Sequence, residues 1–173
     1  IIGDDRDPTT FHPQIKIQRW ANEINSSIRL KHDAILGNVS YSDDGTKITW
    51  IKKQGSKEWK AVFYHRDDLE GGGFEFEIHL PAKPPVNYLE FTVNTKGLDW
   101  FYQPALTQQE IDGGEIRPDK VVGSYAVYHK TKGGMSDDAV MEYKVGKAFH
   151  VFRPHVVDAN NSSTWGVLEL DEI

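Results

Sequence analysis

Apolar and polar residues alternate along much of this chain with a period of two. Phe74, Phe76 and Ile78, for example, alternate with Glu75 and Glu77. The same alternation recurs in residues 47–52, 59–64 and 89–94. It places apolar side chains on one face of a strand and polar ones on the other, as an antiparallel sheet with one solvated face requires. The pattern therefore predicts an all-β protein.

Turn-forming residues separate these runs. Asp43–Asp44–Gly45 is typical of a tight hairpin, and Asp158–Asn161 separates apparent strands at 150–157 and 165–170. Strands at such spacing are typical of a sandwich or barrel. We predict an antiparallel β-sandwich, jelly-roll-like or related, with one or two short helical turns.

Two segments do not have the strand pattern. Thr107 followed by Glu110 forms a capping box, which predicts a helix of one or two turns that ends at Gly113. Residues 136–142 are compatible with a second short turn or with a loop.

The first residues differ from the rest. Residues 1–14 are polar and contain Pro8 and Pro13, so we expect an N-terminal arm followed by a single domain at 15–173. The chain starts without methionine and ends on an apparent strand, so we expect it to be part of a longer, multi-module polypeptide.

Composition excludes several classes of function. The chain of 173 residues has no cysteine, which excludes disulfides and thiolate metal sites. Its formal net charge is −6 and its basic residues are not clustered, so we expect no nucleic-acid partner. No apolar stretch approaches the ~18 residues of a membrane span.

Histidines suggest a metal site only weakly. His129 and His150 are flanked by aromatic residues, and their imidazoles would face each other if the two strands paired suitably. Zinc needs further ligands, so hydrogen-bonded histidines at a core edge explain them better.

Asp158–Glu169 imitates a calcium loop, but Ser163 stands where glycine is required, and a hairpin loop explains the same residues. We predict no metal and no cofactor.

Candidate catalytic groups are equally weak. Glu75 and Glu77 would lie about 7 Å apart on one strand face, a separation that inverting glycosidases use. A solvated strand face produces the same pair. No serine lies in a Gly-x-Ser-x-Gly elbow, and we predict no catalytic residue.

Aromatic residues are the more specific feature. Trp100, Phe101 and Tyr102 cannot all lie on one sheet face, because neighbouring side chains alternate. Either one ring points outward or residues 105–118 fold back over them, which we favour. Exposed rings stack on sugars and anchor protein interfaces. The candidate ligand-binding residues are Trp100, Tyr102, Trp59 and Trp165.

Several motifs occur together in order. Residues 95–107 (TKGLDWFYQPALT) precede 116–129 (IRPDKVVGSYAVYH), and 146–154 (GKAFHVFRP) precede Asp158–Ala159–Asn160. These motifs resemble an uncharacterised family of β-rich structural proteins encoded by tailed phages, prophages and environmental viral sequences. The resemblance covers roughly residues 15–170. It implies a module of a larger virion polypeptide and carries no catalytic residues.

The shared motifs suggest structural roles. Arg117 and Arg153 each precede a proline, and we expect them to pin loops by donating to backbone carbonyls or to Asp99 or Asp119. The residues expected to form a polar seam between two sheets are Tyr125, Tyr128, His129 and His150.

Three functions follow as hypotheses. The first is a non-catalytic structural or adhesion domain of a phage virion-associated protein, located in a virion or outside the cell and bound to neighbouring modules. The second is a carbohydrate-binding module that recognises surface glycans through an aromatic platform. The third and weakest is a glycan-cleaving enzyme that uses Glu75 or Glu77.

Overall fold

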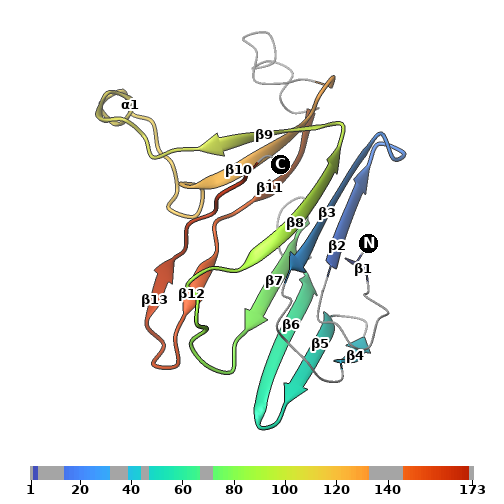
Figure 1. Cartoon of the computed structure of the whole chain (residues 1–173). Helices are drawn as coiled ribbons and strands as arrows, with labels where there is room; N and C mark the ends of the chain where they lie inside the picture. The colour runs from blue at the N-terminus through green and yellow to red at the C-terminus, as the bar shows by residue number, and fades with distance from the viewer. Residues whose placement is uncertain are drawn as a thin grey trace. The chain divides into compact units, whose positions relative to one another are not determined.

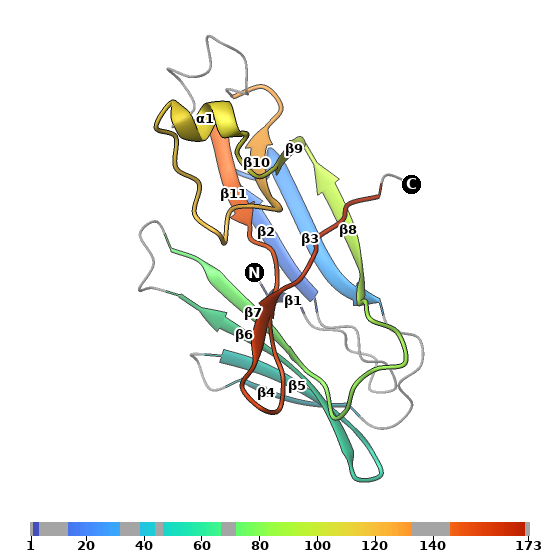
Figure 2. The same ribbon diagram turned by 90° about the vertical axis from the view of Figure 1, so that its left-hand side faces the viewer.

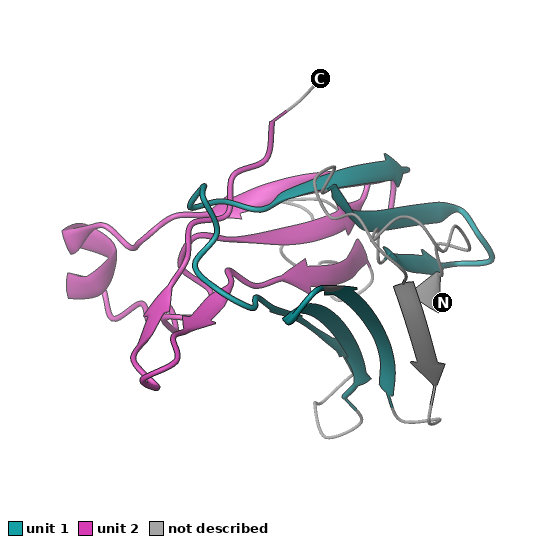
Figure 3. Ribbon diagram, turned by 60° about the horizontal axis from the view of Figure 1, so that its bottom comes forward, with its two compact units in different colours: residues 1–96 teal, residues 97–173 magenta. Residues whose placement is uncertain are grey.

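The computed structural model describes residues 2–3, 14–31, 39–43, 47–66, 72–132 and 146–171. The chain divides into two compact units, Ile1–Lys96 and Gly97–Ile173, where the sequence had led us to expect a single domain at 15–173 (Figure 3). The all-β prediction is confirmed, since antiparallel sheets and one short helix make up the regular structure of the described residues.

One sheet of the N-terminal unit has the strand order β1-β2-β3-β8 (Figure 1). Its strands are β1 (Ile2–Gly3), β2 (Gln14–Arg19), β3 (Ile24–Lys31) and β8 (Glu90–Lys96). β1 belongs to the expected N-terminal arm, yet Ile2 pairs with Ile15 at the sheet edge. That arm therefore extends the sheet at its first residues.

The second sheet of this unit is a meander in which consecutive strands pair, β4-β5-β6-β7 (Figure 2). Its strands are β4 (Val39–Asp43), β5 (Lys47–Gln54), β6 (Lys57–His65) and β7 (Phe74–His79). β4 and β5 pair antiparallel, with Asp43 opposite Ile48, and the tight turn expected at Asp43–Gly45 falls on residues 44–46, which lie outside the described residues.

Apolar side chains from both sheets form the core of the N-terminal unit. Ile15 and Leu30 come from the first sheet, and Trp50, Ala61 and Phe63 come from the second. Phe76 stacks on Phe63 with ring centroids 4.0 Å apart and meets Phe91 edge-on at 5.9 Å. The unit is thus a β-sandwich, with the whole meander inserted between β3 and β8.

The C-terminal unit contains a three-stranded sheet and a hairpin. The sheet has the order β11-β10-β9, and the hairpin is β12-β13. The strands are β9 (Leu98–Gln103), β10 (Ser124–His129), β11 (Lys147–Val151), β12 (His155–Val157) and β13 (Ser163–Trp165).

Two expected strands of this unit have different limits. The strand expected at 150–157 is interrupted at residues 152–154, since Pro154 cannot donate to a strand partner. The strand expected at 165–170 lies instead at Ser163–Trp165, followed by one more backbone hydrogen bond from the amide of Gly166 to Pro154 O at 2.8 Å. Pro154 has no amide to donate in return, so the pairing goes no further there.

The predicted capping box is confirmed at α1 (Gln108–Asp112). Glu110 N donates to the Thr107 hydroxyl at 3.3 Å, and Thr107 N donates to the Glu110 carboxylate at 2.6 Å. Gly113 caps the other end of the helix. The second turn considered at residues 136–142 lies outside the described residues.

Candidate functional site

The residues expected to form one polar seam lie on opposite faces of the β9–β10–β11 sheet. Tyr125 and His129 share one face of β10, opposite Tyr102 and Leu98 of β9. Tyr128 points to the other face of the sheet. His150 of β11 points to that same face, because it pairs with Ala126 of β10. Strand alternation separates the two histidines, so they neither face each other nor form a single network.

His150 instead bonds Ser124, a residue that the sequence analysis missed. The Ser124 hydroxyl donates to Val121 O, so the His150 Nε2–H donates to Ser124 Oγ at 2.6 Å. Burial lowers the pKa of His150 to about 4, and the charges of Lys147 and Lys120 add to this effect. Ser124 is fully buried, so its hydroxyl cannot reach a substrate and the pair has a structural role.

Two of the four candidate ligand-binding aromatics are unsuitable as platforms. Trp59 packs against the core of the N-terminal unit. Trp100 is half-buried and meets Tyr125 and Phe149 edge-on, with ring centroids 6.1 and 5.8 Å apart. Both rings therefore contribute to packing, and a ligand-binding role for either stays a prediction.

The other two, Tyr102 and Trp165, both have Arg153 as a neighbour. Tyr102 is 52% exposed and Trp165 is 37% exposed. The Arg153 Cζ lies 4.7 Å from the Trp165 ring centroid, in a cation–π contact. A Cβ on Gly123 would lie 3.6 Å from Arg153 Cδ and 3.8 Å from the Tyr102 hydroxyl. We call these three side chains the Tyr102–Arg153–Trp165 cluster.

Gly123 allows this arrangement through its backbone. Its φ of +76° lies in the left-handed region, where a Cβ is unfavourable. Its amide donates to Gln103 O at 2.7 Å, so the turn before β10 closes onto the end of β9, next to Tyr102. A glycine directly before an apparent strand was the signal for this turn in the sequence.

The two arginines expected to pin loops behave differently. Arg117 donates through Nη1 to the carbonyl of Pro104. This bond joins the two ends of the segment that contains α1, between Pro104 and Arg117. Arg153 stacks on Trp165, and its buried Nε has no hydrogen-bond acceptor among the described residues. The expected hydrogen bond from Arg153 to a carbonyl or carboxylate is therefore not found in that part of the chain.

The segment that imitates a calcium loop is a hairpin turn. The Asp158 carboxylate accepts from the amides of Asn160 and Ser162 at 2.8 and 2.9 Å. Asn161 adopts the left-handed conformation with φ of +61°. Aspartate and asparagine favour such turns because the side chain bonds nearby backbone.

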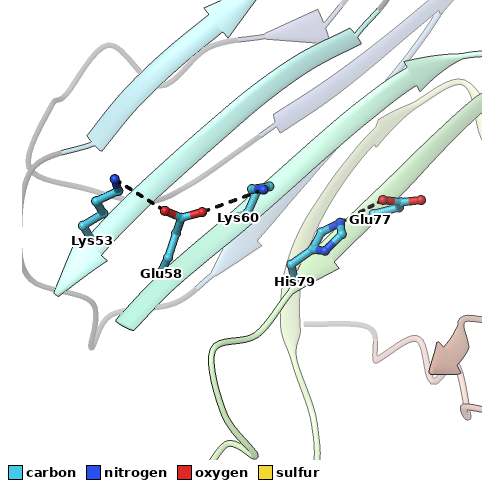
Figure 4. A network of polar contacts seen from close by, with 5 residues as sticks. All are labelled: Lys53, Glu58, Lys60, Glu77 and His79. Carbon is cyan, nitrogen blue, oxygen red and sulfur yellow. Dashed lines mark hydrogen bonds and ion pairs between the residues drawn. The ribbon is translucent and has the colours of Figure 1, made fainter. Parts of the chain in front are cut away.

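Glu75 and Glu77 belong to the polar outer face of the meander. Glu75 pairs with Arg66, while Glu77 accepts from the Tyr64 hydroxyl at 3.3 Å and lies 2.8 Å from His79 Nε2. Lys53 and Lys60 bracket Glu58 on the same sheet, at 3.6 and 3.8 Å (Figure 4). These half-exposed contacts are those of a solvated sheet face, the alternative that the sequence favoured over a carboxylate pair for catalysis.

Neither a metal-binding cluster among the described residues nor a known relative defines this site. No group of three or more histidine, aspartate or glutamate side chains is placed to hold a metal ion within the described ranges. In the same part of the chain, no helix has the length and apolarity needed to cross a membrane. Comparison with protein-family models, curated proteins and solved structures finds no match for this chain.

Proposed function

We propose that this chain is a non-catalytic structural or adhesion domain of a phage virion-associated protein, in a tail, baseplate, fibre or capsid decoration. It would then act in a virion or outside the cell, bound to neighbouring modules. The observation that carries this proposal is the exposure of the β12–β13 hairpin.

Both faces of this hairpin are open to solvent. Successive strand residues point to opposite faces, and Val156 and Val157 are 50% and 54% exposed. A two-stranded hairpin with no covered face is marginally stable in water, so a partner that packs on it would stabilise it. The same segment exposes other large apolar side chains, namely Phe152, Trp165, Val167 and Leu170.

Light scattering of the purified chain over a range of concentrations tests the case in which the partner of the hairpin is a second copy of this chain. We expect a mass above that of one chain, and a monomer for Val156→Lys with Val157→Lys, because an unpaired charge resists burial. Thr92→Lys, on an exposed position of β8, is the matched control and should assemble normally. A wild-type chain that stays monomeric throughout would contradict assembly through this hairpin.

Carbohydrate binding is a second candidate function, favoured by the exposure of Tyr102 beside Arg153. Aromatic rings present apolar faces on which sugars stack. A glycan-array screen should show selective binding that Tyr102→Ala removes. Tyr88→Ala is the control, since Tyr88 is a similarly exposed tyrosine outside the cluster.

A further inference from the structure

We propose that the Tyr102–Arg153–Trp165 cluster binds a sugar that carries a carboxylate, such as a uronic acid unit of an acidic glycan. The inference rests on carbohydrate binding, the second candidate function, and adds the chemical class of the ligand.

Arg153 supplies the recognition of the carboxylate. A guanidinium group stays protonated and presents a planar fork that matches a carboxylate. Its Cζ lies 4.7 Å from the Trp165 ring centroid, a cation–π contact that takes none of its N–H groups as a hydrogen-bond donor to a side-chain oxygen. The Nε is buried without an acceptor among the residues that the structure describes, so a ligand would meet the guanidinium at its two Nη groups. The group is thus held in place and still able to donate to a ligand.

Two lysines lie near the residues that precede Arg153, although the chain as a whole carries −6. Lys120 Nζ lies 5.2 Å from the ring centroid of Phe152, the residue before Arg153. Lys147 and Lys120 are also the two charges that help to lower the pKa of His150. Lysine charges close to the site would help to attract an anion.

Tyr102 supplies the surface for the sugar ring. Its own ring is supported by Tyr125, with centroids 5.4 Å apart and planes tilted by 60°, and it remains more than half exposed. Trp165 already contacts Arg153, and its centroid lies 4.9 Å from that of the His155 ring. Trp165 therefore positions Arg153, while the exposed His155 offers a ring nitrogen to sugar hydroxyls.

Calorimetric titration with an oligomer of galacturonic acid and with its methyl ester tests the carboxylate, because the two ligands differ only at that group, where a charged carboxylate is replaced by a neutral ester. We expect the ester to bind on the order of tenfold more weakly than the acid. Arg153→Gln should lose the same factor for the acid alone, and Arg153→Lys should retain part of it. Tyr102→Ala should weaken both ligands, and Tyr88→Ala should match the wild type.

The outcomes separate this inference from carbohydrate binding itself. Equal binding of acid and ester, lost in Tyr102→Ala, would leave carbohydrate binding standing and overturn the acidic ligand. Binding of neither ligand would overturn the inference, and a glycan array with no binder would also remove carbohydrate binding. If Arg153→Gln fails to fold, Arg153→Lys and Trp165→Ala decide, since an unchanged preference for the acid in both would overturn the role of Arg153.

Discussion

At the residue scale, the half-buried imidazole of His150 links the stability of the C-terminal unit to pH. Its pKa is lowered from 6.5 to about 4, mainly by burial and further by Lys147 and Lys120. Between these two pH values the unfolded chain binds a proton that the folded chain does not. The contribution to stability is complete above about pH 6.5 and is lost as the pH falls towards about 4. We expect the urea midpoint to decrease across this window.

A variant that cannot titrate isolates this contribution from that of the carboxylates. His150→Gln keeps an amide donor for Ser124 and has no proton to gain. Urea unfolding at about pH 7 and about pH 4.5 should show a smaller loss of stability in the variant than in the wild type. An identical loss in both proteins would show that His150 is not the titrating group.

At the scale of elements, the capping box of α1 should matter locally. The helix buries no residue, so Thr107→Ala should leave the global unfolding transition unchanged. It removes the acceptor of Glu110 N and should destabilise the helix by about 1 kcal/mol. Amide exchange at Glu110 and Ile111 measures this loss, and Thr107→Ser should preserve protection. Unchanged exchange in Thr107→Ala would contradict the role of the cap.

The two faces of β6 should respond very differently to substitution. Phe63 is fully buried between Trp50 and Phe76, with ring centroids 5.1 and 4.0 Å away, so Phe63→Ala should cost about 3–5 kcal/mol. Tyr64→Phe, on the outer face, loses only its hydrogen bond to Glu77 and should cost about 1 kcal/mol or less. Urea unfolding compares the two variants. Similar losses in both would contradict the assignment of inner and outer faces.

At the scale of the whole molecule, the division at Gly97 predicts two unfolding transitions. The core cluster that contains Trp50 and Phe63 draws only on the N-terminal unit, whereas Trp100 packs within the C-terminal unit. In variants that keep a single tryptophan, Phe63→Ala should lower the transition reported by Trp50 and leave that reported by Trp100 in place. A common shift of both probes would show that the units unfold together.

Some elements were predictable because their signals are local. β5, β6 and β7 show strict alternation, and α1 has both partners of its capping box within four residues. β2 and β3 were missed, since their turn places Trp20, Ala21 and Asn22 at positive φ without glycine or proline. Such a turn has little composition signal, because tryptophan and alanine rarely adopt that conformation and only Asn22 is of a type that favours it.

The candidate site shows the same limit. Tyr102, Trp165 and Arg153 are recognisable in the sequence as aromatic and cationic residues, but so are Trp59 and Trp100, which pack inside. Their difference in exposure depends on which strands cover them. The turn at Gly123 places Tyr102 near Arg153, and the contact between Arg153 and Trp165 joins residues twelve positions apart in the chain.

The sequence by itself determined that the chain is all-β. It also determined the positions of the strands whose apolar and polar residues alternate, and the residue at which the helix begins. These properties depend on neighbours along the chain, through side-chain periodicity and hydrogen bonds that span three or four residues. Only the tertiary structure decided that His129 and His150 lie on opposite faces, that Ser124 bonds His150, and that two of four candidate aromatics stay exposed. Alternation creates two faces for each strand, but the pairing of strands far apart in the chain selects which side chains meet.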